Sequence, residues 1–274
     1  MMVVGVRTED RYHIVKHLYL IRNQYPRMGL FQPDFICIAI GKYFPSKFQR
    51  SNADIKDAVK LWCTDRMTAT IKYGDIGKWD TWAITSMKNL FNGHSFGGHV
   101  SKQKFNDDIS NWDVSNVTDM SQFAYNAKSF QGLGDMNKWN VSNVTNMNEM
   151  FANASSFIGN ISKWNVSSVT DMASMFQSAI SFNSNISEWN TCSVNEIQDM
   201  FLNANKFNQE IGRWDVSNVS NMEGLFCNAT NFNGNISKWN LKSMRNADEI
   251  FTGCNIEYDH VPTELRMYWV LLDE

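Results

Sequence analysis

Residues 157–179 read FIGNISKWNVSSVTDMASMFQSA, and residues 182–204 and 207–229 repeat the same order of apolar and polar residues. Tryptophan marks the repeat most clearly, because it recurs every 25 residues from Trp139 to Trp239. Intervals of 27 and 33 residues extend the series back to Trp112 and Trp79. A period of this length is typical of stacked repeats, and we therefore predict seven coils. We expect one tryptophan of each coil to join a structural ladder: Trp79, Trp112, Trp139, Trp164, Trp189, Trp214 and Trp239.

Two apolar spacings within a unit predict two kinds of local structure. After Trp164, apolar residues follow at intervals of three and four up to Ala179, which predicts a short helix over residues 168–178. The segment before it, residues 157–164, has a polar turn followed by Ile161 and Trp164, and we interpret it as a short strand. Stacked coils would then place short parallel strands on one side and short helices on the other. The predicted fold is an α/β repeat solenoid with helical caps.

Asparagine and glycine interchange at one position near the end of each predicted helix. These two residue types tolerate positive φ best, and we therefore expect left-handed backbone to end each helix there. The position is occupied by Gly93, Asn126, Asn153, Ser178, Asn203, Asn228 and Gly253, of which Ser178 is the exception in residue type.

The repeat unit F-N-x-x-I-S-x-W-[DN]-V-S-x-V-T-x-M-x-x-M-F-x-N-A resembles that of the BspA-like leucine-rich-repeat surface proteins, over about residues 55–254. The entry segment, AVKLWCTDRMTATIKYGDIGKWDTWAITSMKNLF, is also similar to that family, although Trp82 replaces the small polar residue expected after WDT. The resemblance implies a repeat surface that binds a macromolecule. Many proteins of that family are exported to the cell surface. This chain as written shows neither an export signal nor an anchor, and we therefore expect a cytoplasmic protein.

Four regions are expected along the chain. Residues 1–50 lie outside the repeat and are predicted to form two helices, about 9–22 and 33–44. Residues 51–78 are expected to contain a capping helix, from Asp54 to Tyr73, and the first turn. The solenoid would occupy residues 79–254, and residues 255–274 would form a C-terminal capping helix beginning near Pro262.

Composition argues against several classes of function. A net charge of −3 gives no overall positive potential that would attract nucleic acid. The longest apolar run, FICIAI, is too short to span a membrane. The five cysteines have no zinc-site spacing. Two histidine pairs, His13 with His17 and His94 with His99, lack a third ligand in a recognised motif. We therefore predict no enzyme activity, no metal and no cofactor.

The residue before each ladder tryptophan is the candidate binding position. Neighbouring residues on a strand face opposite sides, and an inward Trp would leave the preceding residue facing outward. Five of these seven residues are basic: Lys78, Lys138, Lys163, Arg213 and Lys238. Such a row could bind an acidic protein segment or an anionic glycan, or it could simply keep an exposed face soluble.

The function that the sequence favours is a non-catalytic repeat scaffold whose partner is another protein. Two alternatives remain open at this point. The segment QPDFICIAIGKYFPSKF, residues 32–48, faintly resembles an F-box, which would make the chain a substrate adaptor of a ubiquitin ligase. An adhesin or glycan-binding surface protein is the other alternative.

Overall fold

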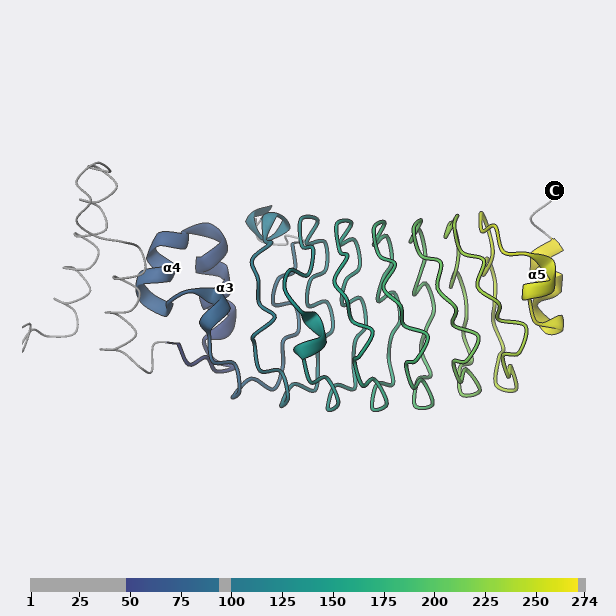
Figure 1. Cartoon of the computed structure of the whole chain (residues 1–274), viewed down its shortest axis with the longest axis horizontal. Coiled ribbons are helices and arrows are strands. Elements are labelled where there is room, and N and C mark those ends of the chain that lie inside the picture. The colour runs from purple at the N-terminus through teal and green to yellow at the C-terminus, as the bar shows by residue number, and fades with distance from the viewer. Residues whose placement is uncertain (1–47, 94–99, 271–274) are drawn as a thin grey trace, which may run out of the picture.

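The computed structural model describes residues 48–93 and 100–270, which wind into coils stacked along one long axis (Figure 1). Helices α3 and α4 lie at one end of the stack and α5 at the other (Figure 1). We name each coil by its ladder tryptophan; the Trp164 coil, for example, comprises residues 161–185. The elements are α3 (Ile55–Thr64), α4 (Arg66–Tyr73), η3 (Ile76–Lys78), η4 (Val100–Lys104), η5 (Met136–Lys138), η6 (Tyr258–His260), η7 (Thr263–Leu265) and α5 (Arg266–Val270).

The predicted α/β fold with parallel strands and short helices is wrong. Over the described ranges, the helices are the three α-helices near the ends and short 3-10 turns, and no β-strand forms. Parallel pairing is limited to isolated bridges of one residue per coil. The bridges join Gln49 to Asp80, Ser86 to Asp119, Asp119 to Asn146, Asn146 to Asp171, Asp171 to Glu196, Glu196 to Asn221, and Asn221 to Asn246.

The predicted helix over residues 168–178 is a run of turns bonded to the next coil. The Met172, Ser174, Phe176 and Ser178 N–H groups donate to carbonyls about one coil further on, at 2.7 to 3.0 Å. An N–H group used in this way does not donate to the carbonyl four residues back. The apolar residues stand three apart for a different reason, because they are the first and last residues of β-turns. One example is the Ala179 N–H, which donates to the Phe176 carbonyl at 3.0 Å.

The predicted strand before each tryptophan is also a turn. In the Trp164 coil, the Trp164 N–H donates to the Ile161 carbonyl at 3.2 Å, and the chain reverses direction where a strand would continue. The two apolar residues face the interior, and the two residues between them form the outer corner of the turn. The same bond closes this turn in all seven coils.

The predicted left-handed column is confirmed at six of its seven positions, but it ends turns and not helices. Positive φ of 54 to 67° occurs at Asn126, Asn153, Ser178, Asn203, Asn228 and Gly253. A second left-handed column lies four residues earlier, at Asn89, Gln122, Glu149, Ser174, Asp199, Gly224 and Glu249. Four of these seven residues are Gln, Glu or Ser, which are not the types that usually mark positive φ, and the sequence therefore gave no clear signal for this second column.

Two columns of phenylalanine fill the interior beside the tryptophans. Phe176 and Phe182 stack within one coil at 3.8 Å between ring centroids, and each stacks on its equivalent in the next coil at 5.8 to 5.9 Å. All of these rings are fully buried. A single coil could not bury such a column alone, so each coil depends on its neighbours for its core.

Each ladder tryptophan from Trp112 onward ties its coil to the preceding one through its indole N–H. Trp189 Nε1 donates to the Ile161 carbonyl at 3.2 Å, and the other five bonds measure 2.8 to 3.2 Å. The side chains are only 2 to 5% exposed, which leaves no ring face free to stack on a sugar. The tryptophans therefore hold the framework together.

Both ends of the stack are covered. The single helix expected from Asp54 to Tyr73 is broken at Asp65, whose carboxylate accepts from the Thr68 N–H and begins α4. Trp62 of α3 packs edge-on against Trp79 of the first coil, at 6.1 Å between centroids. At the other end, Trp269 of α5 donates from Nε1 to the Ile256 carbonyl at 2.8 Å. The two helices expected at 9–22 and 33–44, the F-box-like segment up to residue 47 and the two histidine pairs lie outside the described residues.

The buried, hydrogen-bonded Trp189 predicts different losses of stability for two substitutions. Trp189→Ala should destabilise the chain by about 3–5 kcal/mol, because it removes a buried aromatic ring. Trp189→Phe keeps much of the ring but removes the indole N–H, while the Ile161 carbonyl keeps the Trp164 N–H as a donor, so it should cost only about 0.5–1.5 kcal/mol. Urea denaturation followed by tryptophan fluorescence measures both. A loss below about 1 kcal/mol for the alanine variant would contradict a buried, bonded Trp189.

The left-handed column predicts an unusual tolerance for glycine. Asn203→Gly should leave the free energy of unfolding nearly unchanged, whereas Asn203→Val should lower it by at least about 1–2 kcal/mol, the usual cost of left-handed backbone for an L-residue with a Cβ atom. Asn205→Val, at a position where Ile180 stands one coil earlier, is the control and should cost less. Equal losses for the two valine variants would show that backbone strain at Asn203 is unimportant.

Candidate functional site

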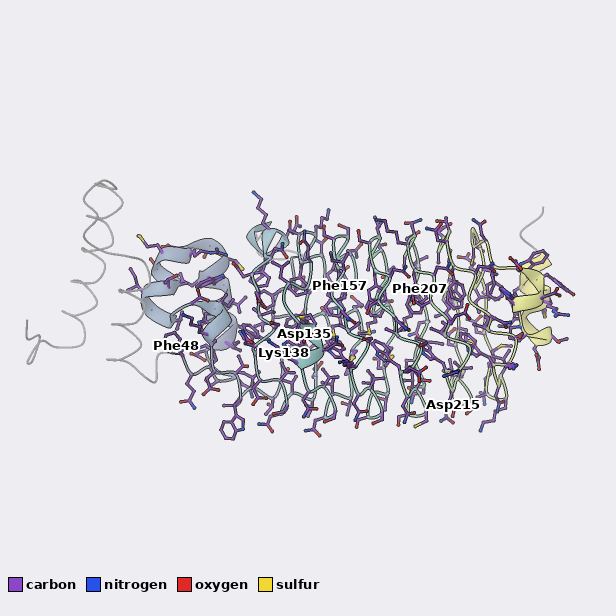
Figure 2. All side chains as sticks on the ribbon, viewed as in Figure 1. Phe48, Asp135, Lys138, Phe157, Phe207 and Asp215 are labelled. Atoms are coloured by element: carbon purple, nitrogen blue, oxygen red, sulfur yellow. The ribbon has the colours of Figure 1, made fainter. Side chains whose placement is uncertain are left out.

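The residue before each ladder tryptophan is the third residue of the turn that the tryptophan N–H closes. This geometry exposes the side chain, whereas the strand alternation expected from the sequence does not exist. All seven residues of this row are exposed: Lys78, Asn111, Lys138, Lys163, Glu188, Arg213 and Lys238. Figure 2 shows Lys138 on η5, close to Asp135, which accepts from the Asn137 N–H at the start of the same turn. We call these seven residues the turn row.

The turn row repeats at about 6 Å. Trp139 and Trp164 are nearly parallel, with 5° between ring planes and 6.1 Å between centroids. Trp189 and Trp214 have the same angle and a separation of 6.3 Å. Parallel rings in equivalent positions are related almost by translation, so their separation is the coil repeat on this side of the stack.

Pairing within the turn row reduces its positive charge. Arg213 Nη1 lies 3.0 Å from Glu188 Oε1, and both side chains are more than 70% exposed, so this ion pair adds little stability. Lys138 Nζ donates to Asn111 Oδ1 at 3.4 Å. Among the described residues, Lys163 and Lys238 make no side-chain hydrogen bond or ion pair. A shallow hollow follows the C-terminal part of the row, lined partly by Glu188, Arg213 and Lys238.

Two rows border the turn row, and all of their members are Asp or Asn except Glu210. The side-chain oxygen of each Asp or Asn accepts from the N–H two residues further on, which fixes a local turn. Asn165 Oδ1, for example, accepts from the Ser167 N–H at 3.2 Å, and Asn160 Oδ1 from the Ser162 N–H at 3.1 Å. Sequence reasoning did not connect this Asx-x-Ser spacing with the direction of the side-chain amide.

A hollow where α3 meets the first coil contains Asp107, which accepts from Trp62 Nε1 at 2.9 Å and pairs with Arg66. Burial raises the pKa of the neighbouring Cys63 thiol to about 11, so that thiol is protonated at neutral pH and is a poor nucleophile. In the described part of the chain, no three His, Cys, Asp or Glu side chains gather as metal ligands would. Nor does any helix there have the length and apolar content that crossing a bilayer requires.

One known protein family matches most of this chain in sequence. The model of a family described as "Mycoplasma protein of unknown function, DUF285" matches residues 64–179 and again residues 157–261. Together the two matches cover well over half of the chain. The chain belongs to this family. No curated protein and no solved structure matches it significantly.

The two DUF285 matches fall on the helical entry and the coils, so the rows described above lie within family sequence. Their overlap over residues 157–179 is the unit that reveals the repeat in the sequence. The match supports a repeat protein of this family, and it does not specify a leucine-rich repeat.

A strip of carboxylates lies on another face of these DUF285 coils, in the second left-handed column and beside it. Burial raises the pKa of Asp199, and the charges of Glu223 and Glu249 raise it further. Because the folded-state pKa is raised, the folded protein binds the proton more tightly than the unfolded chain does. The resulting stabilisation is present at low pH and is lost as pH rises through the folded-state pKa.

Asp199→Asn should therefore stabilise the protein at pH 7, and its advantage should shrink as pH falls toward 3.8, the ordinary value for Asp. Asparagine occupies the equivalent left-handed position in the first coil, at Asn89, so the backbone accepts the change. Urea denaturation of both proteins from pH 7 down to about pH 4 measures the difference. A gain that is independent of pH would show that ionisation of Asp199 is not its cause.

Proposed function

We propose that this chain is a non-catalytic repeat scaffold that binds another protein through the exposed turns of its coils. The observation that supports this most is the contrast between a uniform framework and a varied exposed position. Every coil closes the same turn with a buried tryptophan, while the residue at its outer corner changes among Lys, Asn, Glu and Arg. The framework requires only that this residue be exposed, which leaves its identity free to serve recognition.

The resemblance of the repeat unit to BspA-like leucine-rich-repeat surface proteins supports the same proposal, since it implies macromolecular binding without chemistry. The raised pKa of Cys63 and the engagement of Asp107 with Trp62 and Arg66 also fit a non-catalytic role. A sugar-binding role based on the ladder tryptophans has no support, because those rings are buried.

The test is a pull-down from cells of the native host with three forms of the full chain. The row variant has Glu at Lys138, Lys163, Arg213 and Lys238, and the control variant has Lys at four residues of the other face, Glu149, Glu196, Glu223 and Glu249. Circular dichroism and denaturation first establish that all three are folded. At low ionic strength, where exposed charges act most strongly, we expect a protein partner that binds the original chain and the control but not the row variant. Retention by the row variant would contradict the proposal that the turn row contacts the partner.

A further inference from the structure

In the middle of the stack, the asparagines that border the turn row turn their NH₂ groups away from their own backbone. Each one uses Oδ1 to accept from its own backbone, at 3.0 to 3.2 Å, and the carbonyl end is thereby turned toward the chain. Because an N–H can only donate, the opposite atom of the amide is the NH₂ group. None of these Nδ2 atoms donates to another described residue, and all five residues are exposed: Asn140, Asn160, Asn165, Asn185 and Asn190.

Acidic residues occupy the equivalent positions on both sides of these asparagines. Asp113 and Asp135 stand there toward the N-terminus and accept from their own backbone in the same way. Glu210 and Asp215 stand there toward the C-terminus. Carboxylates present acceptors in place of donors. The donor surface is thus bounded along the axis of the stack.

The charges that the turn row adds inside this boundary are positive, apart from Glu188, which is paired with Arg213. Lys163 stands between Asn160 and Asn165, and Lys138 stands between Asp135, at the boundary, and Asn140. We call this surface the central window: Lys138, Asn140, Asn160, Lys163, Asn165, Asn185 and Asn190. A ligand that fits it has to supply acceptors along its length and negative charge along its middle.

From this arrangement we propose that the central window binds an extended acidic segment of a partner protein, with Asp or Glu at alternate residues. The proposal rests on the scaffold function above and names its ligand. An extended strand repeats every two residues, or about 6.6–6.8 Å, close to the coil repeat of 6.1 Å between Trp139 and Trp164. Alternate side chains would then meet the lysines in successive coils.

The strand backbone fits the two asparagine rows as well. Carbonyl groups of successive residues point to opposite edges of an extended strand, so each edge offers one carbonyl every two residues. Asn160 lies three residues before Lys163 and Asn165 two residues after it, which places amide donors on both sides of the lysine. An anionic polysaccharide would satisfy the charge but has no such pair of carbonyl rows, and the observations therefore favour a peptide.

The experiment measures binding of labelled peptides to the full chain by fluorescence anisotropy at low ionic strength. The probe alternates Glu with Thr over nine residues. The comparison peptide has the same composition with its glutamates in one block, and heparin is the anionic polysaccharide. We expect the alternating peptide to bind at least about tenfold more tightly than the blocked peptide. Equal binding of the two peptides, or tighter binding of heparin, would overturn the proposal.

A matched pair of variants locates the site. The window variant changes Asn140, Asn165 and Asn190 to Asp, which the fold accepts because Asp113 and Asp215 form the same turn in nearby coils. The control changes Asn221, Asn235 and Asn240 to Asp, three turns of the same kind outside the window. The window variant should weaken alternating-peptide binding at least about tenfold and the control less than about twofold. Equal effects would overturn the central window as the site.

Failure of the central-window proposal can be distinguished from failure of the scaffold proposal. If the window variant keeps the native partner and the four-residue row variant loses it, the scaffold proposal stands and the central window is wrong. If the row variant also keeps the partner, the scaffold proposal as stated fails, and the window proposal that rests on it fails with it.

Discussion

Backbone hydrogen bonds between one coil and the next are the interaction on which the rest of this structure depends. Alternate N–H groups of the segment that begins at Met172 donate to carbonyls about one coil further along the chain. Buried backbone groups need partners, and in the described coils, which contain no strands or long helices, these bonds provide them. Side chains add bonds in the opposite direction, to the preceding coil: the Trp189 indole N–H donates to the Ile161 carbonyl, and in an asparagine ladder the Asn208 N–H donates to Asn183 Oδ1 at 2.9 Å.

This constraint accounts for the local features of each coil. A chain that must turn repeatedly within 25 residues needs tight corners, and the left-handed residues and Asx turns supply them. Aligned corners bring equivalent side chains into columns, with Phe176 on Phe201 inside and the turn row outside. The exposed columns can change residue type without disturbing the bonds that hold the coils together. A repeat framework of this kind separates stability from recognition.

The sequence predicted the repeat, the buried tryptophans and the left-handed column, because each depends on residue type at a fixed phase. It could not predict the secondary structure. Apolar residues three positions apart fit both a helix and a β-turn. Only the acceptor of a backbone N–H, such as that of Phe176, distinguishes the two structures. The exposure of Lys163 was expected from strand alternation, but it results from a turn. The pairing of Arg213 with Glu188 depends on the rotamers of two exposed side chains one coil apart, which spacing alone does not determine.

Scalar couplings across hydrogen bonds, detected by NMR on deuterated protein, would distinguish coil-to-coil bonds from helical ones. The structure predicts correlations from the Met172 amide nitrogen to the Glu196 carbonyl carbon and from the Phe176 nitrogen to the Met200 carbonyl carbon. A helix over the same residues would instead correlate the Phe176 nitrogen with the carbonyl carbon of Met172, four residues back. Observation of that intrahelical correlation, with the coil-to-coil correlations missing, would contradict the structure described for every coil.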